Sequence, residues 1–498
     1  MTVTAGLGTN RDDEKTRSSR PRAPEGRLVD WSTAGVAAAT GLVLAALSGR
    51  YGYHRDELYF VQAGRHLAWG YPDQPPLVPV LARGMTLLAP RSLVVLRLPS
   101  TLAAAMVVML GGLTARELGA RRSGQVLASV STALCGFVLA VGHLLSTATF
   151  ALLGCSLTIF LLVRVLQGGD QRLWLAAGLT TGVTLQANLF PGLVLATFAL
   201  AVVTVGPRDI LRTRWPWLAA VIAAAVAAPY LVWQARNGLP QLDIAHSIAA
   251  GGSTSSVSRP LLLPFEALQA GPGLVLLWLP GLVMILRYPR LRSLGFAFLL
   301  LQVALLATGG KTYYASGFFP LLLAAGAQPV LDRARISVPA AIAALSIPGV
   351  IFTLPVLPMR SAGVAVAVNP DVGETIGWHQ FAHQVAAAYG RLPSGAGVLA
   401  QTYGEAGALD RFGGPLGLPR AHSGHNGYAD WGMPAGRTTM LTVGVPEPLL
   451  RASCRGLQRA GTIENRVGID NEEVGKQMFV CTPNAEWRTL WPRFRHLS

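Results

Sequence analysis

Two adjacent carboxylates, Asp56 and Glu57, follow closely on the first long apolar run of this chain, residues 33–48. A carboxylate in hydrocarbon costs about 2.5–3.5 kcal/mol even on insertion scales, so an acidic pair close to a bilayer surface needs a reason. One reason is chemistry, because a carboxylate can act as a general base or hold a divalent cation. The alternative is a solvated loop whose acids pair with nearby arginines, here Arg50, Arg55 and Arg65.

Other polar side chains are placed to join this pair. They are His66, Tyr71 and Asp73 in the same loop, His143 in a later turn, and Lys311 beside Tyr313 and Tyr314. Lys311 is the only Lys between residues 16 and 475. Acids and a cation at one water–lipid boundary suit a reaction on a phosphate-bearing lipid, in which the Lys neutralises phosphate and a carboxylate takes a proton. The plainer alternative is a snorkelling Lys with an aromatic belt, and a lone His in such a loop is usually a satisfied polar contact.

The composition indicates a membrane protein, because 51% of the 498 residues are hydrophobic and only 13% are charged. About eleven apolar runs predict transmembrane helices, at 33–49, 93–114, 124–142, 148–163, 173–187, 190–205, 216–234, 272–286, 294–308, 313–330 and 338–354. Residues 77–90 are apolar but short and contain two prolines and an arginine, so we expect them on the membrane surface.

The net charge of +16 reflects membrane orientation rather than nucleic-acid binding. Arginines gather in every second loop, at 116–122, 164–172, 208–214, 287–292 and 333–335. The positive-inside rule then predicts a plasma-membrane protein with a cytoplasmic N-terminus, whose residues 1–30 form a disordered tail. The membrane module covers residues 31–355, and its first outer loop, 50–92, lies outside the cell.

Residues 356–498 lack long apolar runs and are expected to form a small extracytoplasmic α/β domain. Strand-like stretches at 397–403, 438–445 and 478–481 alternate with helix-like stretches at 375–389 and 404–412. In an oxidising compartment Cys454 and Cys481 are candidates for a disulfide, the alternative being two unpaired thiols in the core.

Well-known catalytic motifs are absent from the sequence. It contains no phosphate-binding Walker loop, no dinucleotide fingerprint, no HExxH and no Cys/His spacing typical of a metal site. No cofactor is therefore predicted with certainty, and a divalent metal is left open as a partner of the acidic pair.

Three segments resemble a known family. They are Asp-Glu-Leu-Tyr at 56–59, Trp-Gly-Tyr-Pro-Asp-Gln-Pro-Pro-Leu at 69–77, and Gly-Lys-Thr-Tyr-Tyr at 310–314 followed by the apolar stretch 319–327. They are similar to the bacterial membrane enzymes of glycosyltransferase family 39, in the GT-C superfamily, related to protein O-mannosyltransferases and the lipid A aminoarabinose transferase. Residues 403–409, 423–428 and 431–432 resemble the C-terminal domain of the actinobacterial branch.

The resemblance implies a GT-C-like polytopic fold and transfer of a sugar from a polyprenyl-phosphate donor on the outer face. It also implies that Asp56 is the essential carboxylate, with Glu57 beside it. In the expected reaction Asp56 takes the proton of an acceptor hydroxyl or amine, the anomeric carbon is inverted, and Lys311 receives the phosphate. Glu57 has two further possible roles, to steer the acceptor or to hold a cation. The acceptor is a protein, a polysaccharide or a lipid.

Two positions depart from the family pattern. Ala151 stands where an acid often follows Thr149-Phe150, and Leu189 stands where a Lys is common in the hairpin between the fifth and sixth spans. These departures keep open a non-catalytic family member. A transporter or flippase of lipid-linked sugars is the other alternative, although such proteins place charged groups at mid-membrane and show internal repeats, and neither is evident here.

Overall fold

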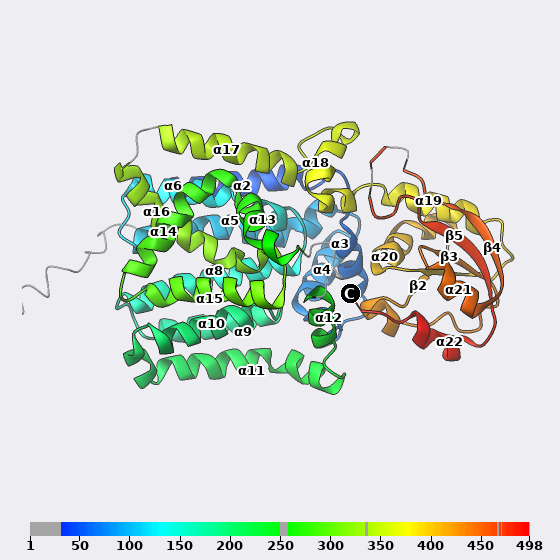
Figure 1. Ribbon diagram of the computed structural model, residues 1–498. Coiled ribbons are helices and arrows are strands. Elements are labelled where there is room, and N and C mark those ends of the chain that lie inside the picture. Colours follow the sequence, from blue (N-terminus) through cyan, green and yellow to red (C-terminus); the bar gives the residue numbers. More distant parts are fainter. Residues whose placement is uncertain (1–30, 250–256, 334–336, 466–467, 470, 498) are drawn as a thin grey trace, which may run out of the picture.

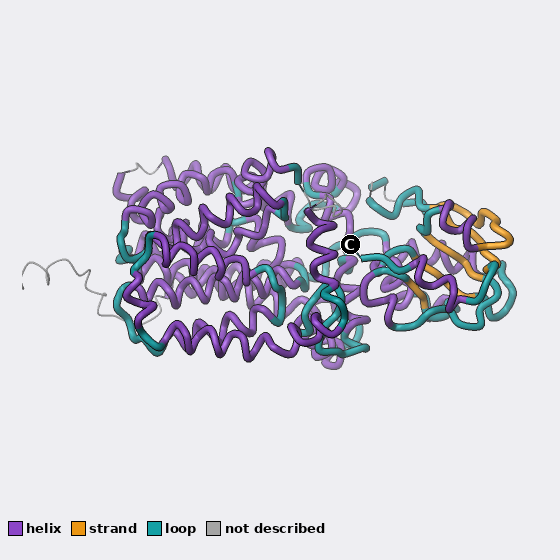
Figure 2. The backbone as a smooth tube through the Cα atoms, turned by 60° about the horizontal axis from the view of Figure 1, so that its bottom comes forward, coloured by secondary structure: helices purple, strands orange, loops and turns teal. Residues whose placement is uncertain are grey.

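The computed structural model describes residues 31–249, 257–333, 337–465, 468–469 and 471–497, so the tail predicted at 1–30 lies outside the described residues. A bundle of roughly parallel helices carries an α/β domain at one end, with a layer of shorter helices between them (Figures 1 and 2). The described part of the chain ends near this layer (Figure 1).

Each apolar run that predicts a span falls on a helix or on a bent pair of helices. In chain order these are α2 (Trp31–Leu47), α5 (Leu93–Glu117), α6 (Arg122–Ala133) with α7 (Gly136–His143), α8 (Thr147–Leu166), α9 (Leu173–Leu185), α10 (Pro191–Thr204), α11 (Trp215–Arg236), α14 (Val275–Arg287), α15 (Arg292–Thr308), α16 (Phe319–Arg333) and α17 (Ser337–Thr353). Residues 334–336 of the last arginine-rich loop lie outside the described part.

Fewer helices of the described chain have the length of a membrane span than the eleven apolar runs predict. Four helices of the described chain are long and apolar enough to cross a membrane, or six when two bent pairs are each counted as one span. The pairs bend by 56° between α6 and α7 and by 95° between α13 (Leu262–Ala270) and α14. Several other helices have 13–17 residues, which at 1.5 Å per residue span about 20–26 Å of a core that is about 30 Å thick. The count of eleven therefore stays a prediction.

The arginine-rich loops meet at the end of the bundle remote from the α/β domain (Figure 1). Several contacts join them: Arg164 pairs with Glu117 at 3.3 Å, Arg121 pairs with Asp332, and Arg292 donates to the carbonyl of Val205. A one-sided distribution of this kind is what the positive-inside rule requires of an even alternation of spans.

The layer at the opposite end contains the first outer loop, and this loop is partly helical. Residues Arg55–Ala63 form α3 and Leu77–Leu88 form α4, with α12 (Pro240–Ala249), α13 and the 3-10 helix η4 (Thr312–Phe318) nearby (Figure 1). The helix α3 was not expected from the sequence. It begins with a capping box in which the His54 ring accepts from a backbone N–H and Glu57 accepts from the His54 N–H.

The α/β domain is built on a five-stranded mixed sheet with the order β2-β1-β3-β5-β4. The strands are β1 (Gly397–Ala400), β2 (Ala421–Ser423), β3 (Met440–Val443), β4 (Cys454–Thr462) and β5 (Gln477–Pro483), and the helices are α18 (Gly363–Val368), α19 (Trp378–Tyr389), α20 (Tyr403–Phe412), α21 (Glu447–Ser453) and α22 (Trp487–Phe494). A disulfide joins Cys454 to Cys481 across the β4–β5 pair, with their Cα atoms 5.6 Å apart. The other two cysteines, Cys135 and Cys155, are free and buried.

One apolar core crosses from the membrane module into this domain. Leu58 and Phe60 of α3 belong to the same buried cluster as Ala406 and Leu409 of α20 and Val398 of β1. Because these residues exclude water together, the domain and the first outer loop pack as one unit.

The orientation predicts the result of two reporter fusions. A reporter that is active only outside the cytoplasm should be active when fused after Ser498 and inactive when inserted in the 208–214 loop, because the α/β domain and this loop lie at opposite ends of the bundle (Figure 1). Activity at both sites, or the reverse pattern, would contradict the predicted orientation and place Asp56 on the wrong side.

Candidate active site

The end of the bundle that carries the α/β domain is anchored by a buried ion pair between Glu57 of α3 and Arg97 of α5. Both side chains are 0% exposed, and two parallel bonds of 2.8 Å join Nε and Nη2 of Arg97 to the two carboxylate oxygens. Two backbone N–H groups complete the shell of the carboxylate, those of Leu145 at 2.9 Å and His54 at 2.8 Å. Four hydrogen bonds offset the cost of removing this carboxylate from water, whereas either partner alone would be a costly buried charge.

Arg97 uses its remaining donors to bind the turns around α3. They reach the carbonyls of Ser48 at 2.8 Å and Gly52 at 2.7 Å, and Nε2 of His143 at 3.3 Å. The guanidinium therefore ties together the end of α2, the start of the first outer loop and the end of α7. His143 is buried behind it and serves as its acceptor, which gives this side chain a structural contact.

Asp56 occupies the adjacent position on α3 and faces a different environment. Its side chain is 35% exposed, and Tyr403 of α20 donates a hydrogen bond of 2.8 Å to its Oδ1. His54 Nδ1 and Arg55 Nε each lie 3.8 Å from the carboxylate. Burial raises the pKa of Asp56, but nearby His54 and Arg55 and the hydrogen bond from Tyr403 outweigh it, so the pKa lies below its ordinary value. Asp56 is thus an accessible, ionised carboxylate.

Asp73 is a second carboxylate close to Asp56, and its pKa is shifted in the opposite direction. Tyr59 donates a hydrogen bond of 2.7 Å to its Oδ1. Burial, together with the negative charge of Asp56, raises the pKa of Asp73 to about 6 despite that bond. Tyr59 and Tyr403 stack with ring centroids 4.7 Å apart, so a pair of stacked tyrosines connects the two acids. Carboxylates whose pKa values are pushed apart are typical of acid–base sites.

Lys311 is a further cation at this end of the bundle. Its Nζ lies 5.8 Å from the centroid of the Tyr313 ring, and its positive charge is among those that lower the pKa of Asp56. It stands at the start of η4, just after Gly309, whose φ of 81° lets the chain turn out of α15. The ring of Tyr314 stacks on that of Phe190 with centroids 4.2 Å apart, which holds Tyr314 against the α9–α10 turn.

Two other residues of the predicted substrate loop have structural contacts. The Tyr71 hydroxyl donates to the carbonyls of Ala63 and His66, which closes the loop on the end of α3. The His66 ring stacks on Trp431 of the α/β domain at 4.7 Å, and its Nε2 lies 3.0 Å from Arg420. These side chains hold the loop in place. Asp56, Asp73 and Lys311 remain as the candidates for proton transfer and phosphate binding.

Several residues of the site were not found from the sequence. Tyr59, Tyr403 and Trp431 are distant in the chain and meet only in the folded protein. Arg97 carried a signal, because it is a lone basic residue within the apolar run 93–114, and ionisable residues in such runs mark functional or paired positions.

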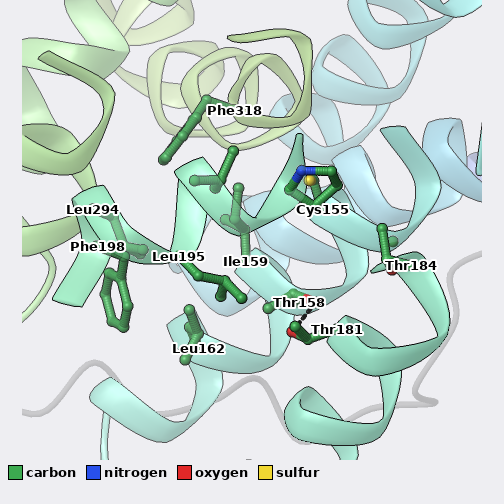
Figure 3. A pocket seen from close by; sticks show the side chains of 13 residues that line it. Cys155, Thr158, Ile159, Leu162, Thr181, Thr184, Leu195, Phe198, Leu294 and Phe318 are labelled. Atoms are coloured by element: carbon green, nitrogen blue, oxygen red, sulfur yellow. Dashed lines mark hydrogen bonds between the residues drawn. The ribbon is translucent and has the colours of Figure 1, made fainter. Parts of the chain in front are cut away.

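A small apolar cavity lies elsewhere, inside the membrane module (Figure 3). Side chains from α8, α9, α10 and α15 line it, among them Ile159, Phe198 and Leu294, and its one polar contact shown is between the hydroxyls of Thr158 and Thr181 at 3.4 Å (Figure 3). None of the candidate residues Asp56, Asp73 and Lys311 lines this cavity.

The described residues also contain no group of three or more His, Cys, Asp and Glu side chains that could hold a metal ion. Within the described part of the chain, both carboxylate oxygens of Glu57 accept hydrogen bonds from the guanidinium of Arg97.

Comparisons with known proteins agree with this architecture. Residues 73–233 match the family model described as dolichyl-phosphate-mannose-protein mannosyltransferase. The structure is similar to that of ArnT from Cupriavidus metallidurans in the apo state, with a TM-score of 0.60, 13% identity, and coverage of 89% of this chain and 97% of that chain. It is also similar to the same protein bound to undecaprenyl phosphate, with a TM-score of 0.53, 16% identity and the same coverage. No curated protein matches the chain.

A family model supports the resemblance to family 39 over residues 73–233, and the structural likeness confirms the expected polytopic helical fold with a small C-terminal α/β domain. These findings concern the fold and the family. The roles of individual residues rest on the geometry described above.

The buried ion pair predicts a large loss of stability when one partner is neutralised. Glu57→Gln should lower the free energy of unfolding by about 3–5 kcal/mol, because it leaves Arg97 buried without a counter-charge. Thermal unfolding in detergent measures the effect. Glu117→Gln is the matched control, since its partner Arg164 is partly exposed, and it should cost about 1 kcal/mol or less. Equal shifts for the two variants would contradict the anchoring role of Glu57.

Proposed function

We propose that this protein is a membrane glycosyltransferase that moves a sugar from a polyprenyl-phosphate donor to an acceptor at the end of the bundle that carries the α/β domain. The observation that carries the proposal is Asp56, an accessible and ionised carboxylate on a helix that the buried Glu57–Arg97 pair holds in place. The likeness to ArnT, which was solved with undecaprenyl phosphate bound, supports a lipid phosphate as the donor carrier.

The chemistry follows from the charges at the site. Asp56 takes the proton of an acceptor hydroxyl or amine as that atom attacks the anomeric carbon of the donor sugar. The bond between the anomeric carbon and the phosphate oxygen breaks, and the electron pair leaves with the polyprenyl phosphate. Attack opposite to the leaving group inverts the anomeric carbon. No protein nucleophile is required, because a phosphate monoester is already a good leaving group.

Lys311 is proposed to receive the charge of the departing phosphate. Its ammonium group lies near Asp56, and no hydrogen bond or ion pair of its side chain is observed with the described residues other than its contact with the Tyr313 ring. A point charge of this type suits a phosphate, whose oxygens accept from several directions. Tyr313 and Tyr314 would then shape the place where the phosphate lies.

Glu57 is assigned a structural role in this scheme. Its oxygens already accept four hydrogen bonds, so it has no free lone pair with which to bind an acceptor proton. Asp73 takes its place as the second acid of the site. A carboxyl whose pKa is about 6 carries a proton for part of the time near neutral pH. It can therefore donate a hydrogen bond to the acceptor substrate or receive one from it.

The base assignment predicts the effect of Asp56→Asn. This change keeps the size of the side chain and removes the proton acceptor, so transfer should fall about 10²–10⁴-fold while donor binding changes little. Initial rates of transfer and donor binding on the purified protein measure both quantities. Asp430→Asn, on the surface of the α/β domain, is the control and should retain full activity. Near-normal turnover of Asp56→Asn would refute Asp56 as the base.

The phosphate assignment predicts the effect of Lys311→Ala. Donor binding should weaken by about 1.5–3 kcal/mol, the range for a hydrogen bond to a charged group. Lys311→Arg should recover part of the loss, because the charge is kept. Binding of an uncharged polyprenol serves as the control and should be the same in all three proteins. Unchanged donor binding by Lys311→Ala would mean that the Lys only snorkels to the interface.

A further inference from the structure

We propose that the α/β domain supplies a positioning residue of the site, Tyr403, whose hydroxyl fixes the orientation of the Asp56 carboxylate, so that the site is complete only with this domain docked. The inference deepens the proposed function and rests on it for the catalytic meaning of Asp56. The contact itself is a feature of the structure, since Tyr403 donates to Oδ1 of Asp56 at 2.8 Å across 347 positions of sequence.

Local structure fixes where Tyr403 stands. It is the first residue of α20, which begins with a capping box: the Thr402 hydroxyl accepts from the Glu405 N–H at 3.2 Å, and the buried Glu405 carboxylate accepts from the Thr402 N–H at 2.8 Å. With both orphan donors satisfied, the first turn of α20 has a defined position and aims Tyr403 at α3.

The two helices approach each other unusually closely. A Cβ atom added at Gly404 would lie 2.8 Å from Cβ of Arg55, and one at Gly407 would lie 3.0 Å from Cβ of Leu58. Real Cβ atoms essentially never show the distance at Gly404, and the distance at Gly407 is tighter than that of most real Cβ contacts. Glycine at these two positions, one turn apart, therefore lets α20 lie directly on α3. This close packing brings Tyr403 within hydrogen-bond reach of a residue on another domain.

Aromatic rings extend the contact into a stacked column that crosses the boundary between the domains. Neighbouring ring centroids are 4.5, 4.6, 4.7, 5.6 and 4.7 Å apart along the order His496, His425, Tyr403, Tyr59, Trp431 and His66. The first outer loop supplies Tyr59 and His66, and the α/β domain supplies the other four. Each stacked pair adds apolar contact and restrains ring orientation, so the Tyr403 ring has little freedom to turn away from Asp56.

The same domain also sets the surroundings of the neighbouring groups. Arg55, next to Asp56, forms ion pairs with Glu472 at 2.6 Å and Glu374 at 3.8 Å. The Gly427 N–H donates to the Tyr59 hydroxyl at 3.1 Å, which leaves the Tyr59 proton directed at Asp73. Both carboxylates of the site thus have their tyrosine partner placed by the α/β domain.

The groups that influence the ionisation of Asp56 come from several elements, and Tyr403 is one of these groups. The others are His54 and Arg55 of the first outer loop, Lys311 before η4, Asp73 in the loop before α4, and Tyr313 and His425. Among these groups only Tyr403 donates a side-chain hydrogen bond to the carboxylate in the described part of the chain. A hydrogen bond to the charged form favours ionisation, so its removal should raise the pKa of Asp56.

The test is the pH dependence of Tyr403→Phe, which removes the hydroxyl and keeps the ring in the column. The acidic limb of kcat should move to higher pH by roughly one unit, because a hydrogen bond to a charged group is lost, while the KM for the donor stays the same. Tyr428→Phe is the matched control: its hydroxyl donates to Asp410 at 3.1 Å, in the same domain but on another carboxylate, and its acidic limb should not move.

A second measurement does not depend on turnover. Infrared titration of carboxylates, as the difference between the protein and its Asp56→Asn variant, reports the ionisation of Asp56 directly and can be repeated in the Tyr403→Phe background. An upward shift of the midpoint supports the inference, and coincident midpoints with an unmoved acidic limb overturn it. If the shift is present but Asp56→Asn retains turnover, the contact stands and the proposed role of Asp56 as the base fails. If Asp56→Asn loses turnover and no shift is found, only the role of Tyr403 fails.

Discussion

The buried ion pair between Glu57 and Arg97 is the contact on which the outer end of this molecule depends. Two charges without exposed surface are stable here because each oxygen of the carboxylate and each N–H of the guanidinium has a partner. These partners belong to α2, α3, α5, α7 and the turns between them. The pair therefore fixes the start of α3 relative to the bundle, and with it the position of Asp56.

Glu57 and Asp56, which are adjacent on α3, have different surroundings and different roles in this account. Glu57 points into the bundle, where it is saturated and holds the structure together. Asp56 points toward the α/β domain, where it is accessible and ionised, with Tyr403 as its donor. One helix thus joins the anchoring charge of the membrane module to the proposed base of the site, and the α/β domain packs on its other side through Gly404 and Gly407.

Much of the fold was predictable because membrane spans follow from the length of apolar runs, and all predicted runs fall on helices. The acidic pair, Asp73 and Lys311 were also predicted as candidate site residues from their positions next to those runs. The helix α3 was missed because His54, which caps it, is not among the usual N-cap residues. The strand β4 was missed because its sequence, Cys454–Thr462, contains two glycines and two arginines and few residues that favour strands. The contact of Tyr403 with Asp56 has no local signal, since it depends on the packing of two helices 347 positions apart.

The central claim is that this protein breaks the bond between a sugar and a polyprenyl phosphate. The most direct measurement is to incubate the purified protein with a panel of polyprenyl-phosphate sugars and to follow free polyprenyl phosphate by mass spectrometry, in parallel with the Asp56→Asn variant. We expect one donor of the panel to be consumed by the unmodified protein, with the variant slower by orders of magnitude. Release of polyprenyl phosphate at the same rate by both proteins, or from no donor at all, would contradict the account.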